Sequence, residues 1–139
     1  MKESIQKWIG QAEHDFENAR KTLEIDLYDL SIISCQQSAE KILKALYIQL
    51  KSEEPPRIHS IRKLMALTDI PAEMLEEVAD LDSYYLALRY PDVSELMPYE
   101  NCSKEDAELA IKKTEQILNL VKSKINELKN EEENNGHEG

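Results

Sequence analysis

Residues 28–50 read YDLSIISCQQSAEKILKALYIQL, and this stretch decides the fold class. Its apolar residues recur at helical spacing and cover more than one narrow stripe. They are Ile32, Ile33, Cys35, Ala39, Ile42, Leu43, Leu46, Tyr47 and Leu50. Apolar residues that cover so much of the helix circumference are typical of a central helix with neighbours on two sides. The stretch therefore predicts a central helix over about Tyr28–Leu50, with Gln36 and Glu40 one turn apart and directed toward protein.

Other segments on both sides of this helix show the same periodicity. They are expected at about Ser4–Leu23, Ser60–Leu67, Ala72 to Leu88 or Arg89, and Ser103–Lys129. Prolines separate several of them, because a proline ends a helix or opens one at its first turn. The sequence predicts an all-α fold, an antiparallel four- to five-helix bundle over residues 1–129. Residues 130–139 form a polar acidic tail that we expect to be disordered.

The composition limits the class of protein. The chain has 139 residues, 41% of them hydrophobic, with only 3 Gly and 5 Pro, which suits one helical domain better than a turn-rich β fold. Its net charge of -11 argues against a general nucleic-acid binder, because phosphate contacts need a basic surface. Cys35 and Cys102 lack metal-ligand spacing, which favours a reducing cytoplasm, and Cys35 is expected to be buried. No secretory signal and no membrane span are expected.

A group of polar residues on otherwise apolar helix faces is the candidate site. Gln36 and Glu40 lie on the central helix, and Asp82, Tyr85 and Arg89 lie on the helix predicted from Ala72. Because burying a lone charge is costly, these groups should pair with one another. Two interpretations stay open. Arg89 either pairs with Glu40 or Asp82 and sets helix register, or it lines a groove and binds a phosphate with its planar fork.

Most known catalytic signatures are absent from the sequence. It contains no Gly-x-Gly-x-x-Gly, no phosphate loop and no His-Glu-x-x-His, so we expect no metal and no cofactor. His14 is expected on the exposed side of the first helix, and His137 lies in the tail. His59 opens the third helix, where it either packs locally or acts as a proton-transfer group.

Motifs in four places resemble those of HEPN domains (higher eukaryotes and prokaryotes nucleotide-binding). The run Ser34–Leu46 is similar to the family's QQAAEKALKAL helix, and His59–Leu64 is similar to its HsL..L element. Arg89–Asp92 is similar to its RYPD element, and Trp8–Ala19 fits the opening of its pattern. Order and spacing agree over about Trp8–Leu120, nearly the whole chain.

The resemblance implies an all-α bundle, commonly a homodimer, that acts with a small nucleotidyltransferase of the minimal type, often as a toxin–antitoxin pair. It also implies that the catalytically active branches are metal-independent RNases, which use an Arg and, after four to six intervening residues, a His. After Arg89 those positions hold Ser94, Glu95 and Leu96, so the Arg is present and the His is not. His59 is then the remaining candidate for proton transfer.

Three functional hypotheses remain open from the sequence. The first is an accessory binding module for a nucleotide or RNA, with a groove formed by Arg89, Tyr90, Asp92, Tyr85, Asp82, Glu40 and Gln36. The second is an RNase toxin with a divergent site around Arg89 and His59. The third is a purely structural helical dimer in which the polar residues only set the packing.

Overall fold

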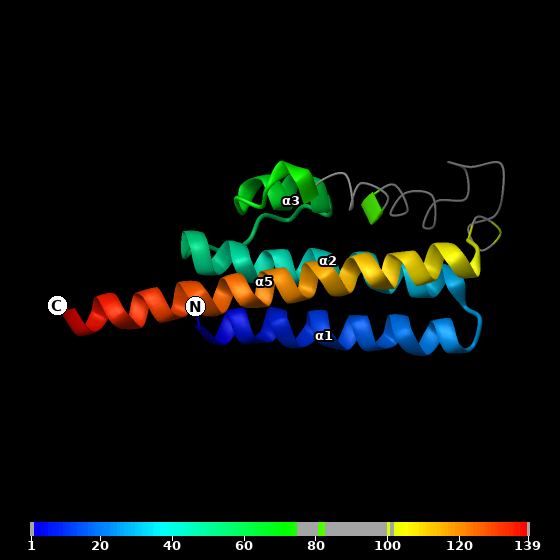
Figure 1. Ribbon diagram of the computed structural model, residues 1–139, viewed down its shortest axis with the longest axis horizontal. Helices are drawn as coiled ribbons and strands as arrows, with labels where there is room; N and C mark the ends of the chain where they lie inside the picture. Colours follow the sequence, from blue (N-terminus) through cyan, green and yellow to red (C-terminus); the bar gives the residue numbers. More distant parts are fainter. Residues whose placement is uncertain (1, 75–80, 83–99, 101, 139) are drawn as a thin grey trace.

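The computed structural model describes residues 2–74, 81–82, 100 and 102–138 (Figure 1). Every element of regular secondary structure in this part of the chain is a helix, which confirms the predicted all-α class. The elements are α1 (Lys2–Glu24), α2 (Tyr28–Lys51), α3 (Ile61–Leu67), the short 3-10 helix η1 (Ala72–Met74) and α5 (Lys104–Glu138). The helix predicted from Ala72 to Arg89 and the loop predicted after it fall mostly on residues 75–80 and 83–99, outside the described residues.

Helix α2 is the centre of the bundle, as predicted from the apolar residues around most of its circumference (Figure 1). It contacts α1, α5 and α3, and Ile32, Ile42, Leu43 and Leu46 are each 0% exposed. Helix α1 runs antiparallel to α2 and to α5, whereas α2 and α5 point the same way along the bundle (Figure 1). The predicted antiparallel arrangement holds for α1 against both α2 and α5. Helices α2 and α5 share a direction because α5 starts at the end of the bundle where α1 turns into α2.

Small residues let α1 and α2 approach closely. Ala12 and Ala19 are 0% exposed. Two serines of α2 donate hydrogen bonds across the contact, Ser38 Oγ to Ala12 O at 2.6 Å and Ser31 Oγ to Ala19 O at 2.8 Å. These bonds satisfy buried hydroxyls that would otherwise destabilise the contact. The contact fixes α2, which carries the candidate site residues Gln36 and Glu40.

The predicted start of the last helix is confirmed by its cap. Ser103 N donates to Asp106 Oδ2 at 3.1 Å, and Asp106 N donates to Ser103 Oγ at 3.1 Å. This reciprocal pair satisfies two backbone donors that the first helical turn leaves without partners. Helix α3 is capped in a similar way, because Ser60 Oγ accepts a hydrogen bond from Lys63 N at 3.2 Å.

Helix α5 extends beyond its predicted end near Lys129 and continues to Glu138. The prediction of a disordered tail from Asn130 is therefore corrected for residues 130–138. Polarity suggested disorder, but adding residues to an existing helix needs no new nucleus, and no proline interrupts this segment. Gln49 Nε2 of α2 also donates to Glu132 Oε1 at 3.0 Å, which ties the extension to the bundle.

Gly10 is an exposed glycine in the interior of α1. A Cβ placed there meets no atom within 4 Å. Alanine has fewer unfolded conformations to lose than glycine, so we expect Gly10→Ala to raise the free energy of unfolding by about 0.5–1 kcal/mol. Urea unfolding measures this change in free energy, and we expect the midpoint to rise while the m-value stays unchanged. A lower midpoint would contradict an open, unstrained position for Gly10.

Candidate functional site

Glu40 lies at the centre of a group of polar side chains inside the bundle. Its side chain is 9% exposed, and Oε1 accepts a hydrogen bond from Lys44 Nζ at 2.9 Å. The same Oε1 lies 2.8 Å from His59 Nδ1, and Gln36 Nε2 lies 3.5 Å from Oε2. A buried carboxylate needs such partners to offset the cost of leaving water. We call Gln36, Glu40, Lys44 and His59 the polar cluster.

Two parts of the chain build the polar cluster. Helix α2 supplies Gln36, Glu40 and Lys44 at a spacing of four, which stacks them along one face. The segment between α2 and α3 supplies His59, whose carbonyl accepts a hydrogen bond from Gln36 Nε2 at 3.0 Å. The other polar atom of this amide, Gln36 Oε1, is buried and has no hydrogen-bond partner within the described part of the chain.

His59 connects the buried carboxylate to the surface. Its side chain is 57% exposed, against 9% for that of Glu40. In the tautomer that carries its proton on Nδ1, the Nδ1–H group of His59 donates a hydrogen bond to an ionised Glu40 through Oε1. A carboxylate that orients a histidine in this way is a recurrent feature of catalytic triads. The contact with Glu40 is compatible with both sequence interpretations of His59, local packing and proton transfer, and the choice between them stays open.

Asp82 stabilises the N-terminus of α3. Its Oδ1 accepts from Ile61 N at 2.6 Å, and its Oδ2 accepts from Arg62 N at 2.9 Å and from Ser60 Oγ at 3.1 Å. A carboxylate in this position satisfies the first backbone donors and matches the positive end of the helix dipole. Asp82 therefore holds the segment that follows His59.

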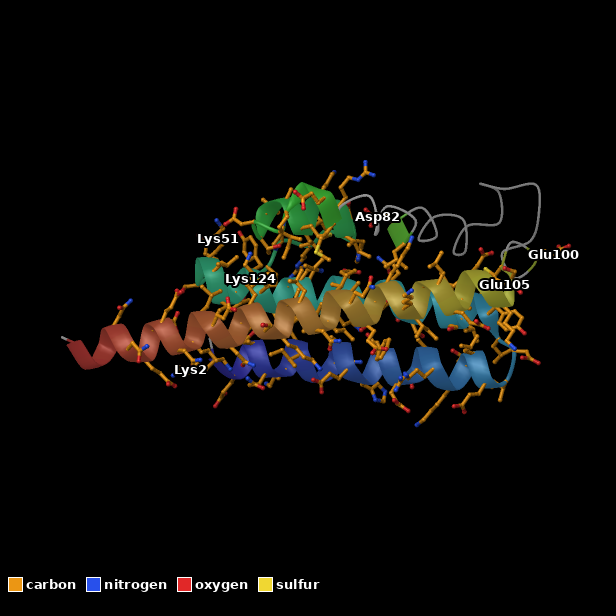
Figure 2. All side chains as sticks on the ribbon, viewed as in Figure 1. Lys2, Lys51, Asp82, Glu100, Glu105 and Lys124 are labelled. Carbon is orange, nitrogen blue, oxygen red and sulfur yellow. The ribbon has the colours of Figure 1, made fainter. Side chains whose placement is uncertain are left out.

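The opposite end of α3 is held from α5. Lys124 Nζ donates to the carbonyl of Asp69 at 3.3 Å, just after α3 ends. Asp69 has a φ of 59°, in the left-handed region, so this contact fixes a strained turn. Asp82 therefore anchors one end of α3 and Lys124 the other; both residues are labelled in Figure 2.

The structure brings together only part of the polar group predicted from the sequence. Gln36 and Glu40 are buried and in contact, as predicted. Asp82 interacts with α3, and the proposed partner Arg89 lies outside the described residues, as do Tyr85, Tyr90 and Asp92. The choice between an Arg89 ion pair and an Arg89 phosphate contact therefore stays open.

Sequence reasoning missed Lys44. Lys44 is 6% exposed, and its Nζ also lies 5.5 Å from the centroid of the Trp8 ring. The signal was present, because Lys44 follows Glu40 by one helical turn on a helix that is otherwise apolar at Leu43, Ala45 and Leu46. A buried lysine in that register predicts an ion pair with Glu40.

The cysteines do not contribute a reactive group to this site. Burial raises the pKa of the Cys35 thiol to about 12, although a hydrogen bond with Thr114 works in the opposite direction. Burial, followed by the charges of Asp29 and Asp106, raises the pKa of Cys102 to about 11. Both thiols therefore stay protonated near neutral pH. Among the described residues, no group of three or more His, Cys, Asp and Glu side chains could hold a metal ion, and none of the helices has the hydropathy of a membrane-spanning segment.

Comparison with known proteins gives matches over most of the chain. The model of the HEPN domain family matches residues 5–124. A protein of Methanocaldococcus jannaschii named "Putative toxin MJ1304" is 28% identical over an alignment of 132 residues, and the match covers 86% of this chain and 87% of that protein. The crystal structure of TT1696 from Thermus thermophilus has a TM-score of 0.77 and 31% identity, with 86% of this chain and 97% of that chain covered. The crystal structure of ST0689, described as an archaeal HEPN homologue, has a TM-score of 0.75 and 41% identity, with 87% and 97% covered.

Proposed function

The chain belongs to the HEPN domain family, and from this premise we propose that it is one member of a toxin–antitoxin pair whose other member is a small nucleotidyltransferase. It acts in the cytoplasm as a homodimer. The Methanocaldococcus jannaschii relative supports the toxin–antitoxin assignment, because its name contains the word toxin and the likeness spans most of both chains.

The polar cluster is the observation that carries this proposal. A bundle that served only as a scaffold would be as stable with apolar side chains in place of a buried ion pair. This chain instead buries Glu40 and Lys44 together and joins them to a histidine that is 57% exposed. That arrangement favours a ligand site over the purely structural dimer.

The ligand of this site is a nucleotide or an RNA phosphate. His59 presents an N–H or a lone pair, and Arg89 supplies a planar pair of donors for phosphate oxygens. Tyr85, Tyr90 and Asp92 complete the groove in this proposal, with Gln36 and Glu40 behind His59. Asp82 contributes by holding α3 in place beside the site.

Co-expression of this chain with a small nucleotidyltransferase of the minimal type from the same genome tests the proposal. We expect the two proteins to elute together, with a mass by light scattering that requires two copies of this chain. The matched control is the same enzyme mixed with an unrelated acidic helical protein. Separate elution at low salt would contradict the partnership.

RNA cleavage without a metal is a second candidate function, and the Glu40–His59 contact favours it. The reaction needs a base that takes the 2′-hydroxyl proton and an acid that protonates the leaving oxygen. His59 oriented by Glu40 at 2.8 Å suits the first role, and in this candidate a solvent water protonates the leaving oxygen. Arg89 stays protonated and suits stabilisation of the negative charge on the phosphorane rather than proton transfer. This candidate predicts cleavage that depends on His59, and the corresponding variants are described in the Discussion.

A further inference from the structure

Four large apolar side chains are exposed at the end of the bundle where α1 turns into α2 and where α5 starts (Figure 1). Ile25 is 65% exposed, and Leu27, Leu30 and Leu109 are between 40% and 48% exposed. Among the described residues, one other large apolar side chain is exposed, that of Leu67 on α3. Exposed apolar residues that gather in one place are typical of a binding surface. We call Ile25, Leu27, Leu30 and Leu109 the apolar patch.

The turn between α1 and α2 presents two residues of the apolar patch on an ordered backbone. Leu27 N donates to Thr22 O at 2.8 Å, and Asp26 N donates to Leu23 O at 3.1 Å. These two bonds form a Schellman motif, which ends α1 with a left-handed residue, here Asp26 at a φ of 62°. The positions of Ile25 and Leu27 are therefore fixed before any partner binds, which lowers the entropy cost of binding.

Acidic side chains surround the apolar patch. Residues 24–30 and 102–109, together with Glu100, contain one base, Lys104, and seven acids. The acids are Glu24, Asp26, Asp29, Glu100, Glu105, Asp106 and Glu108. A hydrogen bond to Asp26 is the main cause that raises the pKa of Tyr28, and the charges of Glu105 and Glu108 act in the same direction. The start of α2 and the start of α5, where Figure 2 shows Glu105, therefore share one negative field.

This combination of apolar and acidic side chains selects among possible occupants. RNA and anionic membranes carry phosphate groups, which the acids would repel. A second copy of the chain has the same patch, and a two-fold contact would bring both sets of acids together. A protein surface with apolar side chains and basic residues around them complements both features.

We infer that the small nucleotidyltransferase docks on the apolar patch, and that its contact surface carries apolar side chains flanked by Lys and Arg. This inference rests on the proposed function and adds to it the docking surface and the chemistry of the enzyme's side. None of the four residues of the patch belongs to the polar cluster or to the groove predicted around Arg89. A change in the patch therefore leaves the candidate catalytic residues in place.

Leu109→Lys is the test variant, because Leu109 is exposed on the second turn of α5, where a lysine side chain can extend into water. We expect it to weaken the complex with the enzyme about tenfold or more, since it removes an apolar contact and places a cation against the enzyme's cations. Biolayer interferometry with the immobilised enzyme measures the affinity, and thermal melts verify the fold of each variant. Leu67→Lys is the matched control, because Leu67 is 42% exposed, against 48% for Leu109, and lies outside the patch. Its affinity for the enzyme should equal that of the wild type.

Glu105→Gln tests the contribution of charge. We expect the association rate to fall about threefold and to depend less steeply on salt, because the variant removes one charge from the rim of the contact. Glu54→Gln is the matched control, since Glu54 is an exposed acid in the loop after α2, at the other end of that helix from the patch. The association rate of this control should equal that of the wild type.

The outcomes separate this inference from the proposed function. If no nucleotidyltransferase elutes with the wild type, the partnership is wrong and the docking surface is wrong with it. If the wild type forms the complex and Leu109→Lys binds as tightly as Leu67→Lys, the partnership stands and the docking surface alone is wrong. If Leu109→Lys without the enzyme lowers the light-scattering mass of the chain from two copies to one, the patch is a contact between copies, which also overturns the inference.

Discussion

The Glu40→Ala variant is expected to lose roughly 3 kcal/mol of unfolding free energy, near the lower end of the range for breaking a buried ion pair. Removing the carboxylate leaves Lys44 with a side chain 8% exposed and no partner at 2.9 Å. It also removes the acceptor that lies 2.8 Å from His59 Nδ1. We place the value at the lower end because Lys44 borders a hollow on the surface and can reach some water. Urea unfolding monitored by circular dichroism measures the change.

Two further variants identify the cause of this loss. Glu115→Ala removes a glutamate whose side chain is 51% exposed and lies 4.0 Å from Arg20, and it should change stability by no more than about 0.5 kcal/mol. The double variant Glu40→Ala/Lys44→Met should recover much of the loss, because no charge then remains buried and unpaired. If the double variant is as unstable as the sum of the single variants, the pair is not the source of the effect.

The His59→Gln variant is expected to lower RNA cleavage by about 100-fold or more, the usual contribution of a general base. The glutamine side chain can still donate a hydrogen bond to Glu40, but it cannot take up the 2′-hydroxyl proton. The assay uses a mixed RNA pool at low salt with EDTA present, and thermal melts of each protein run beside it. His14→Gln is the matched control, because His14 is an exposed histidine on α1 away from the polar cluster. It should cleave as the wild type does.

Arg89→Ala in the same assay separates the candidate functions. Loss of cleavage with an unchanged melting temperature supports a phosphate contact. A large drop in melting temperature supports the ion-pair interpretation, in which a buried partner is left unpaired. Cleavage that survives in His59→Gln would exclude His59 as the base. No cleavage by the wild type would remove the RNase candidate and leave the nucleotidyltransferase partnership to the co-elution experiment.

The helical elements were predictable because helix signals are local. Apolar residues three and four positions apart predicted α1 and α2, and Ser103 with Asp106 predicted the start of α5. The end of α5 was less predictable, because composition alone does not show whether a polar segment continues an existing helix. The contact from Gln49 to Glu132 joins residues 83 positions apart in the chain, and no local pattern signals it.

The candidate site was predictable only in the part that lies on one helix. Gln36 and Glu40 share a face of α2, so helical geometry alone places them together, and the same geometry would have identified Lys44. Helical geometry could not predict the role of Asp82. Its three hydrogen bonds go to backbone and side-chain donors at the start of α3, 20 to 22 residues away.

The sequence by itself determined the all-α class, the centre of the bundle at α2, the family and the inward direction of Gln36 and Glu40. Tertiary structure decided that α2 and α5 run the same way, that Asp82 holds α3 and that His59 meets Glu40 from 19 residues away. The physical reason is the range of the interactions. Helix periodicity arises between residues within one turn, whereas the Glu40–His59 contact depends on the path of the chain through the Pro55-Pro56 loop.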